Sequence, residues 1–552
     1  MNISRLFHTV RYLRPSQVVL RIVRRFQHPS GDVSPAPEVR SLGGGWVRPA
    51  EKYVSLVSSD RARFLNEERN ISGSTIWNDP GMEKLWLYNL HYFDDLNAEN
   101  APERRAWHDG LINRWIAENP PVSGNGWEPY PTSLRIVNWF KWCIATAMPF
   151  SQIPDFQNSL AVQTRYLSQT LEYHLLGNHL LENAKALIFA GTFFQGPEAD
   201  GWIKTGLDIL TREIPEQILP DGGQFERSPM YHAIALEDMC DLINVFRAYP
   251  ESIPPNRKTF VDTWPAIAER MLGWMKVMCH PDGEIALFND AAHKIAPSPK
   301  EIGMYCGRLG IVDHNTVAGD EKMHFSHLES SGYIQVEQEH AVTFLDLAPI
   351  GPDYLPGHAH ADTLTFECSL FNQRVVVNSG TSCYGLGDER LRQRSTPAHN
   401  TVVVDNENSS EVWSGFRVAR RAYPQNLSIV QDDNSISVSC EHNGYTRLPG
   451  KPIHARQWHF GSGSIQIFDK IKGAHTTAEA RFHLHPDVLC NQIDTRTIEL
   501  ILPKGQRCTL TFSAHPIELE KSSYHPEFGI SLPCICISVA FIDELTTSLA
   551  WT

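Results

Sequence analysis

Two histidines and an aspartate stand at alternate positions in residues 357–366, which read GHAHADTLTF. Because residues two apart in an extended chain project to one face, His358, His360 and Asp362 could converge on one site. Imidazoles and a carboxylate gathered in this way can bind a metal ion, move protons or close the hydrogen-bonded end of a strand. The segment alone leaves these three chemistries open.

A third imidazole, His399, stands just before another strand-like run at 401–404. Zinc commonly takes three protein ligands from histidine and carboxylate side chains, so His399 favours a metal site. Arg390, Arg392 and Arg394 precede it. Such a charge run is typical of a solvated turn, although Arg394 is also a candidate for contact with an anionic substrate.

The segment 127–138, in the N-terminal half of the chain, combines indole rings with polar side chains. Trp127 opens a proline-broken loop, and Arg135 and Asn138 lie three apart on the helix expected to follow. An arginine and an amide beside Trp rings can hold a carboxylated sugar. The alternative is the polar beginning of an ordinary helix.

Residues 177–185, GNHLLENAK, place a polar face on an otherwise apolar helix. On that helix His179 and Glu182 lie three apart, and Asn178 and Glu182 lie four apart. A polar face on a buried helix must be hydrogen-bonded or functional. The spacing lacks the second histidine of the HExxH pattern, which argues against a metalloprotease.

Residues 221–232, DGGQFERSPMYH, predict a glycine turn followed by a helix that starts at Pro229. Tyr231 and His232 then fall in the first helical turn. A phenol beside cationic groups can have its pKa lowered from about 10 toward a catalytically useful value. The alternative is a tyrosine that caps the core at a helix start.

The elements that must position these residues change type once along the chain. From about Glu83 to Leu309 apolar residues recur at intervals of three and four, which predicts helices. From about Ser331 short β-rich runs alternate with turn residues, which predicts an antiparallel β domain. The expected strands are Val342–Leu345, Leu364–Phe366, Arg374–Val377, Thr401–Val404, Ser435–Val438, Ser464–Phe468 and Ile498–Leu502.

We therefore predict an α+β multidomain chain. Its expected parts are a basic N-terminal extension and helical lead-in over 1–80, a helical domain over 81–325 and a β domain over 326–552, with the linker between Gly310 and Ser330. A length of 552 residues agrees with two large domains rather than one core.

Composition narrows the classes of partner. The chain has 63 acidic and 49 basic residues and a net charge of −14, which argues against nucleic acid as a partner. A local basic cleft can still bind an anion, because distant charges are screened beyond roughly 8 Å at physiological salt. The 14 Trp, 16 Tyr and 24 His suit a sugar-stacking cleft, although large cores use them too. Eleven Cys without a CxxC pair predict neither a disulfide framework nor a zinc ribbon.

The N-terminal residues 1–28 are basic but lack the continuous apolar core of a secretory signal. Val18 to Ile22 fits a basic amphipathic helix, either solvated or in contact with a membrane surface or partner. No stretch reaches the 18 or so apolar residues of a membrane span. The sequence alone therefore predicts no membrane span and a cytoplasmic location.

The ordered set Asn178-His179, Tyr231-His232, 358–362 and 398–402 resembles the heparinase II/III-like polysaccharide lyases, which include alginate lyases. The resemblance implies an incomplete (α/α) toroid followed by an antiparallel β-sandwich domain, with a cleft between them. It implies β-elimination at a uronic acid of an acidic polysaccharide or oligosaccharide, such as capsule or exopolysaccharide. It also implies a periplasmic or cell-surface location, in contrast to the sequence alone.

This chemistry explains the residue types. The C5 proton beside a carboxylate is weakly acidic, so the carboxylate must be neutralised, the proton accepted and the O4 leaving group protonated. The resemblance implies that Asn178 and His179 neutralise the carboxylate. It makes Tyr231 the acid and, in a syn elimination, also the base. His358 serves as base for the opposite C5 configuration or as a second neutralising group.

The resemblance also suggests which other side chains contact substrate. Arg135 or Arg227 would assist carboxylate neutralisation, and Tyr384 matches a second tyrosine of the relatives. The complete expected set of substrate contacts is Trp127, Arg135, Asn138, Glu182, Arg227, His232, Tyr384 and Arg394.

A structural zinc ion is the one cofactor that the resemblance implies, with no organic cofactor. Its ligands would be His360 and His399, and relatives supply an aspartate where this chain has Asn378. Because an amide is a weaker zinc ligand than a carboxylate, the metal is absent, weakly held, or completed by Asp362 or another group.

Three alternatives come from other classes. A helical toroid also carries glycoside hydrolases, for which Glu128, Glu182, Glu226 and Asp221 are possible carboxylate pairs. The same scaffold could be a catalytically silent polysaccharide-binding or assembly protein. The 358–362 spacing also matches the start of a metallo-β-lactamase-like signature, but position 363 is Thr and no αββα pattern surrounds it.

Overall fold

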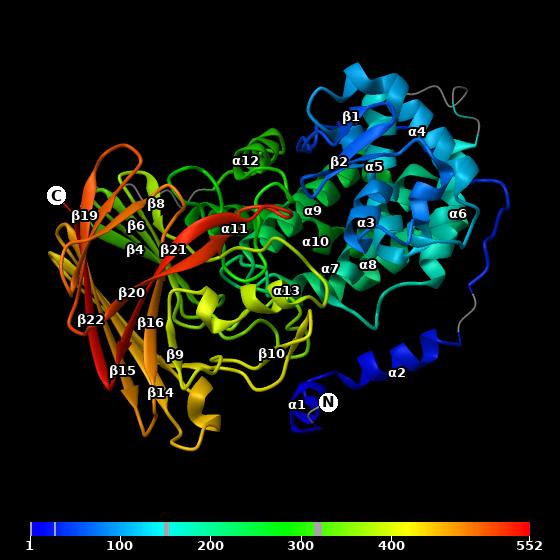
Figure 1. Cartoon of the computed structure of the whole chain (residues 1–552). Helices are drawn as coiled ribbons and strands as arrows, with labels where there is room; N and C mark the ends of the chain where they lie inside the picture. Colours follow the sequence, from blue (N-terminus) through cyan, green and yellow to red (C-terminus); the bar gives the residue numbers. More distant parts are fainter. Residues whose placement is uncertain (1–2, 27–28, 148–152, 154, 314–322, 552) are drawn as a thin grey trace.

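The computed structural model describes residues 3–26, 29–147, 153, 155–313 and 323–551. Figure 1 shows helices gathered in one half of the molecule and strands in the other. The change occurs between α12 (Pro299–Arg308) and β4 (Met323–Leu328). The predicted fold class, a helical N-terminal domain followed by an antiparallel β domain, is confirmed.

Helices of the N-terminal domain repeatedly begin at proline. Proline at the first helical position sacrifices no intrahelical hydrogen bond and presets the backbone angle. Pro129, Pro197, Pro229 and Pro299 each start a helix in this way. With α12, the described helices of this domain are α3 (Lys84–Tyr92), α4 (Arg105–Glu118), α5 (Pro129–Thr146), α6 (Phe156–Gln169), α7 (Gly177–Phe193), α8 (Pro197–Gln217), α9 (Pro229–Ala248), α10 (Lys258–Val261) and α11 (Trp264–Val277).

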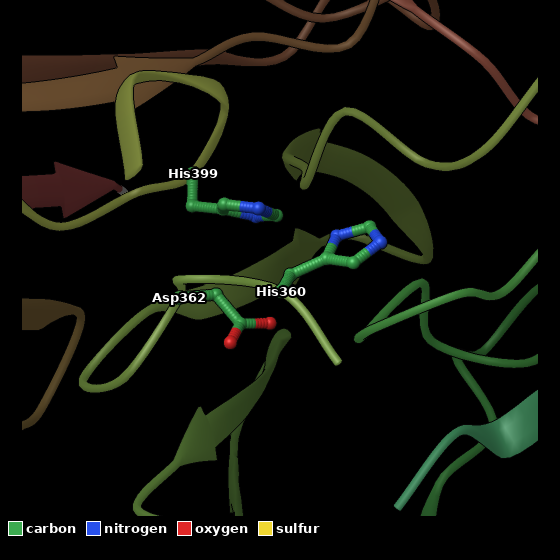
Figure 2. A group of neighbouring side chains, drawn as sticks. All are labelled: His360, Asp362 and His399. Atoms are coloured by element: carbon green, nitrogen blue, oxygen red, sulfur yellow. The ribbon is translucent and has the colours of Figure 1, made fainter. Parts of the chain in front are cut away.

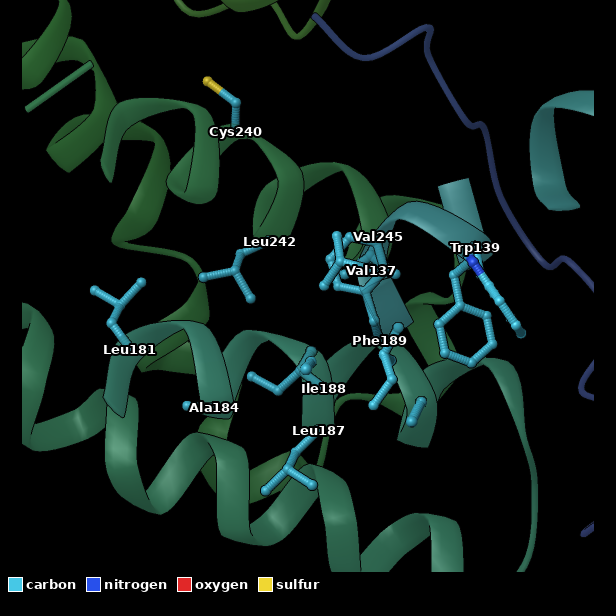
Figure 3. Packing of buried hydrophobic residues seen from close by; sticks show 14 of the residues in the cluster. Val137, Trp139, Leu181, Ala184, Leu187, Ile188, Phe189, Cys240, Leu242 and Val245 are labelled. Atoms are coloured by element: carbon cyan, nitrogen blue, oxygen red, sulfur yellow. The ribbon is translucent and has the colours of Figure 1, made fainter. Parts of the chain in front are cut away.

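Helix α7 lies at the centre of the helical domain and is buried along nearly its whole length. Figure 3 shows Leu181 and Ile188 of α7 on the side of Val137 of α5 and Leu242 of α9, whereas Leu187 points to the other side of the helix; all five belong to one core. Burying apolar side chains on every side explains why this segment has no solvated face. Its polar residues must therefore find partners inside the domain.

Within the described residues, the β domain contains three large antiparallel sheets and one two-stranded pair at 412–418. The first joins β4 (Met323–Leu328), β5 (Tyr333–Gln338), β6 (Ala341–Asp346), β7 (Phe366–Leu370) and β8 (Gln373–Val376). The second has the order β12 (Pro424–Asp432), β13 (Ser435–His442), β14 (Ile453–Gly461), β15 (Ser464–Lys472), β22 (Glu544–Trp551), β19 (Arg507–Phe512), β18 (Thr497–Ile501) and β17 (Leu489–Gln492). The third has the order β20 (Ile517–Tyr524), β21 (Leu532–Phe541), β16 (Ala478–His483) and β9 (Val402–Val404).

Side chains from all three sheets meet in one apolar core, as a layered sandwich requires. The core includes Ile334 from the first sheet, Trp458 from the second and Phe482 from the third. Strand β13 alternates buried and half-buried residues, so one of its faces joins this core.

Two expectations about strands are wrong. The first strand of the β domain begins at Met323 rather than near Ser331, since two histidines interrupt the apolar alternation of β4. Strand β7 begins at Phe366, so Leu364 lies outside it. Leu364 has a φ of 66°, a left-handed conformation that a strand cannot contain.

Smaller elements lie outside the two main bodies. A three-stranded sheet of β1 (Leu56–Ser58), β2 (Arg61–Phe64) and β3 (Glu67–Asn70) precedes the helical domain. Helices α1 (Ile3–Val10) and α2 (Pro15–Arg24) come first, and α13 (Asp388–Gln393), β10 (Val412–Trp413) and β11 (Arg417–Val418) belong to the β-domain loops. Within the described residues, no helix is long and apolar enough to cross a membrane.

Candidate active site

Tyr231 lies in the first turn of α9, as the sequence predicts. The Ser228 hydroxyl caps this helix by accepting a hydrogen bond from the Tyr231 amide at 3.3 Å. The cap fixes the backbone of Tyr231, and the side chain points toward loops of the β domain, where its hydroxyl lies 2.9 Å from the hydroxyl of Tyr384. Two phenols from the two halves of the molecule therefore meet.

His358 stacks on Tyr231, with ring centroids 3.9 Å apart and an interplanar angle of 17°. Its Nδ1 lies 2.7 Å from Oε2 of the buried Glu226. Because an ionised carboxylate can only accept, this contact places the proton on Nδ1 and leaves a lone pair on Nε2. In the neutral imidazole, Nε2 is then the atom that can accept a proton.

Arg390 lies against the ring of Tyr384. Its guanidinium lies 4.9 Å from the ring centroid of Tyr384 and donates a hydrogen bond of 2.6 Å to Oδ2 of Asp290. Both partners of this ion pair are buried. Burial alone would raise the pKa of Asp290, but Arg390 outweighs it and holds that pKa well below its usual range. The arginine is thus a buried support and not part of a solvated turn.

The expected lowering of the Tyr231 pKa is wrong. Burial raises the pKa of Tyr231 above its ordinary value, and the hydrogen bond from Tyr384 opposes this rise only in part. Desolvation disfavours the phenolate more than nearby cations stabilise it. Tyr231 is therefore a neutral proton donor at physiological pH.

Asn178 and His179 occupy the first turn of α7. A Cβ on Gly177 would lie 2.4 Å from Leu355 and 3.7 Å from Oε1 of Glu226, so this turn adjoins the carboxylate that binds His358. Gly177 itself has a φ of 59°, which favours glycine. The start of α7 and the Glu226–His358 pair therefore form one site.

His179 carries a carboxylate partner of its own. Nδ1 lies 3.2 Å from Oε1 of Glu172, and the ring packs on Tyr130 at 4.4 Å between centroids. Burial lowers the pKa of His179, but the attraction of Glu172 outweighs it and raises that pKa above 6.5. The side chain is 34% exposed, so the imidazole is accessible at the site.

His360, Asp362 and His399 gather separately, with one potential ligand atom from each within 4.8 Å of the others. Figure 2 shows the three side chains as neighbours, with the His399 ring extending toward the ring of His360 and Asp362 beside them. His358 is not part of this group, which agrees with its separate assignment from the resemblance; the initial possibility that all three neighbours converge does not hold. The segment is a loop ahead of β7, and the strand geometry on which that expectation rested is absent.

The three side chains have nitrogen and oxygen atoms that could bind a cation. His360 Nδ1, Asp362 Oδ2 and His399 Nε2 are all buried without a hydrogen-bond partner among the described residues. His360 Nε2 lies 2.8 Å from Asp290, and His399 Nδ1 lies 3.2 Å from Oδ1 of Asn378. These two acceptors keep the protons on the far nitrogens, which directs both lone pairs inward. Asn378 thus orients His399, and Asp362 offers the third ligand atom.

Several predicted substrate contacts are wrong because their side chains are buried among structural partners. Arg135 is fully buried and bonds to Gln163, and Trp127 and Asn138 face the core of the helical domain. His232 bonds to the Met271 carbonyl, and burial lowers its pKa to about 4. Arg394 donates a hydrogen bond of 3.0 Å to the Ala359 carbonyl, so it stabilises the loop that carries His358 and His360. Arg227 is half-buried and donates to the Ser331 carbonyl.

Glu182 belongs to a buried charge network and does not reach solvent. Burial and the neighbouring Asp238 raise the pKa of Glu182 well above its ordinary value. Asp238 in turn accepts from Lys185 at 2.5 Å, and Lys185 also pairs with Asp241 at 2.9 Å. The expected role of Glu182 in substrate binding is therefore wrong.

Sequence reasoning missed three supporting acids. Asp290 carries no local signal, since it lies 70 residues from His360. Glu172 lies seven residues before His179, just outside the 177–185 segment. Glu226 was singled out only as a candidate for hydrolysis, although it lies five residues before Tyr231. A search for carboxylates that could orient each candidate histidine would have raised all three.

Two family models match this chain. The heparinase II/III N-terminus matches residues 97–300, and the heparinase II/III-like C-terminal domain matches residues 320–552. Together they cover most of the sequence, and they meet at the change from helices to strands.

Among curated proteins, a heparin-sulfate lyase of Bacteroides stercoris is 28% identical over 292 residues, which are 49% of this chain and 41% of that protein. A heparin-sulfate lyase of Pedobacter heparinus is 27% identical over 278 residues, 46% of this chain and 40% of that protein. The matched part is thus less than half the length of either relative. The crystal structure of heparinase III has a TM-score of 0.65 at 16% identity, covering 85% of this chain and 76% of that one, which shows a shared fold. The chain belongs to the heparinase II/III-like family.

Proposed function

We propose that this protein is a polysaccharide lyase that cleaves a uronic-acid-containing acidic polysaccharide by β-elimination. The observation that carries the proposal is the stacked pair of Tyr231 and His358, held by Tyr384 and Glu226 beside the exposed His179. An acid, a base and a cation within one site are the three groups that β-elimination requires. Names of the curated relatives, all heparin-sulfate lyases, support the same class of reaction.

Acid and base can be assigned by their protonation. Tyr231 keeps its proton because burial raises its pKa, so it would donate to the O4 leaving group. His358 has a free Nε2 lone pair when Glu226 holds Nδ1–H, so it would accept the C5 proton. Tyr384 lies within hydrogen-bond distance of Tyr231 and would relay a proton from solvent to it, while His358 releases to solvent the proton taken from C5.

Residues at the start of α7 would neutralise the carboxylate of the uronate. His179, whose pKa Glu172 raises, would place a positive charge beside the uronate. Asn178 adjoins it and would donate through its amide, and helix N-termini favour anions by their exposed N–H groups. Negative charge that builds on the carboxylate during C5 deprotonation would be stabilised there.

A zinc ion fits the group of His360, Asp362 and His399, whose inward atoms lack partners among the described residues. When bound, zinc would supply a structural cross-link and no chemistry at the substrate. Burial raises the pKa of Asp362 to about 7, and a bound cation would favour its ionised form. The loop that carries His358 would be anchored two residues from its catalytic position.

Product analysis tests the activity directly. Purified protein would be screened against heparan sulfate, hyaluronan, chondroitin, alginate and other uronate polymers, with absorbance followed near the ultraviolet band of an unsaturated uronate. A lyase leaves a C4=C5 double bond, whereas a glycoside hydrolase leaves a saturated reducing end. Saturated products would overturn the proposal in favour of hydrolysis. Tight polymer binding without any product, with zinc added and over several pH values, would favour a catalytically silent protein.

The variant Tyr231→Phe removes the acid without removing the ring. We expect a loss of kcat of at least about 100-fold with little change in the thermal midpoint, because general acid catalysis contributes about that much. Tyr53→Phe is the matched control, since Tyr53 is 38% exposed. Near-normal turnover by Tyr231→Phe would refute its assigned role.

Removal of the metal tests the second part of the proposal. We expect close to one zinc per chain by elemental analysis, and a lower thermal midpoint after chelation. His399→Ala should bind no zinc and should show no further shift with chelator. If the wild type contains no zinc and chelation leaves its thermal midpoint unchanged, His360 and His399 are not zinc ligands and form only a hydrogen-bonded group.

A further inference from the structure

Helix α2 exposes a continuous apolar stripe. Val18, Val19, Ile22 and Val23 are between 41% and 56% exposed, and Phe26, just beyond the helix, is 77% exposed. Their spacing of one, three and four residues places them on one face of a helix. Isolated exposed apolar residues are normal on protein surfaces, but a stripe of this kind marks an interaction surface.

Helix α1 repeats the pattern. Ile3, Phe7 and Val10 stand four and three residues apart and are 81%, 63% and 46% exposed. Phe7 is a large aromatic side chain, and aromatic residues contribute strongly to interfacial burial. None of the residues in α1 is buried against the body of the protein.

The opposite sides of both helices are already occupied. Gln17 is buried and donates to the Tyr354 carbonyl at 3.4 Å, and Arg24 lies 2.7 Å from His174. In α1, Thr9 accepts from the Trp413 indole at 3.0 Å. Figure 1 shows both helices along one edge of the molecule, outside the helical and β domains. The apolar stripes therefore face away from the body that holds the helices.

The charge of this segment is opposite to that of the whole chain. Residues 3–31 contain six arginines and neither Asp nor Glu, whereas the protein carries a net charge of −14. On the helical wheel of α2, Arg21 and Arg25 border the stripe and are exposed. A basic border beside an apolar face is the pattern of helices that lie in the surface plane of an anionic membrane.

We propose that α1 and α2 dock the protein on an anionic phospholipid surface, with the apolar stripes inserted among the acyl chains and Arg21 and Arg25 at the headgroups. Docking on an apolar protein surface would not require the arginines. Binding of an acidic polymer would not require the apolar stripe. Anionic lipid matches both features. The acidic remainder of the chain would be repelled, which orients the molecule with this edge toward the membrane.

Co-flotation of the full-length protein with vesicles tests the proposal. We expect binding to phosphatidylcholine vesicles that contain about one third phosphatidylglycerol, and at least about tenfold weaker binding to phosphatidylcholine alone. Ile22→Asn should weaken binding to the anionic vesicles about tenfold, because it removes one inserted side chain. The matched control is Ile542→Asn, at a residue that is 79% exposed in the β domain. Equal binding of the two variants, or no binding of the wild type, would overturn the proposal.

A second pair of measurements separates lipid from other partners. Replacing Arg21 and Arg25 by Gln should weaken vesicle binding, and 0.5 M salt should weaken it for the wild type. Binding to a soluble acidic polysaccharide that Arg21 and Arg25 support but Ile22 does not would assign the segment to polymer binding instead. A wild-type dimer that Ile22→Asn converts to monomer, without vesicle binding by either, would assign the stripe to self-association.

Discussion

Each histidine of the site is defined by the carboxylate that holds it. His358 is held by Glu226, His179 by Glu172 and His360 by Asp290. Because each pair fixes which nitrogen carries the proton, three imidazoles of similar sequence context acquire different chemistry. In the proposed mechanism His358 is the base, His179 carries the positive charge and His360 is a candidate metal ligand.

The Glu172–His179 pair makes a prediction about pH. Protonated His179 is the form that neutralises the uronate, so kcat/KM should be high below the pKa of His179 and should fall as pH rises through it. Glu172 raises that pKa. Glu172→Gln should therefore move the alkaline limb of the pH profile to lower pH. The value of kcat/KM at the optimum should fall less than the value on the alkaline limb.

The measurement is a kcat/KM profile from pH 5 to 9 on one responsive polymer. Glu198→Gln provides a control, because Glu198 is a half-exposed partner of Arg165 at the start of α8. An alkaline limb that stays in place in Glu172→Gln would show that another group controls it.

At the residue scale, the sequence could identify reactive types but not their environment. Asn178, His179, Tyr231, His358 and Tyr384 come together at one site. Residues on the same stretches, such as His232 in the turn of Tyr231, point into the core. Neighbours on a helix face opposite directions, and which direction is solvent depends on packing with elements far away in the chain.

At the scale of elements, α7 and α8 are held at unusually short range by glycines. A Cβ on Gly206 of α8 would lie 2.7 Å from Ile188 Cγ1 and 2.8 Å from the Ala184 carbonyl of α7. Gly191 of α7 meets Ile203 of α8 in the same manner, at 2.5 Å. The close contact fixes the position of α7, whose first turn carries Asn178 and His179.

Two substitutions in α8 separate packing from helix propensity. Gly206→Ala should lower the free energy of unfolding by about 1–3 kcal/mol, since the added methyl group forces the helices apart. Gly201→Ala adds the same methyl group where nothing lies within 4 Å, so it should raise stability by about 0.5–1 kcal/mol. Urea unfolding of both variants checks the contrast, and equal effects would refute the role of close packing.

Element type was largely predictable, because long apolar periods and β-rich runs survive in a single sequence. Helix starts at Pro129 and Pro229 follow from local chemistry. The sequence correctly placed residues 358–365 ahead of a strand, but it treated this loop as extended chain. Its shape is fixed by Arg394, which binds the Ala359 carbonyl from another part of the chain, and a local pattern contains no trace of that contact.

On the scale of the whole molecule, buried polar contacts join the helical segment to the β domain. Asp290, before α12, bonds to Arg390 and His360 of the β domain, and Asp221 accepts from the Ser331 amide at 2.7 Å. His280 lies 2.8 Å from Glu367 with both side chains fully buried. Since the proposed acid Tyr231 and base His358 come from different domains, these contacts set the geometry of the reaction.

Buried neutral histidines should make the folded state sensitive to acid. Burial lowers the pKa of His232 to about 4, whereas the unfolded value is about 6.5. The folded protein therefore does not bind this proton between pH 6.5 and 4, but the unfolded chain does. Stability contributed by the neutral His232 is complete above pH 6.5 and is lost as pH falls toward 4.

His232→Gln isolates this contribution, because a glutamine amide can donate to the Met271 carbonyl but does not titrate. At pH 7.5 we expect the wild type to be more stable than the variant. Between pH 7.5 and 4.5 that advantage should shrink by on the order of 3 kcal/mol, which corresponds to one proton taken up on unfolding. Urea unfolding at several pH values, with chelator present so that metal binding does not contribute, gives the two stability curves. Parallel curves would show that His232 is protonated in the folded protein, and would contradict its burial as a neutral core residue.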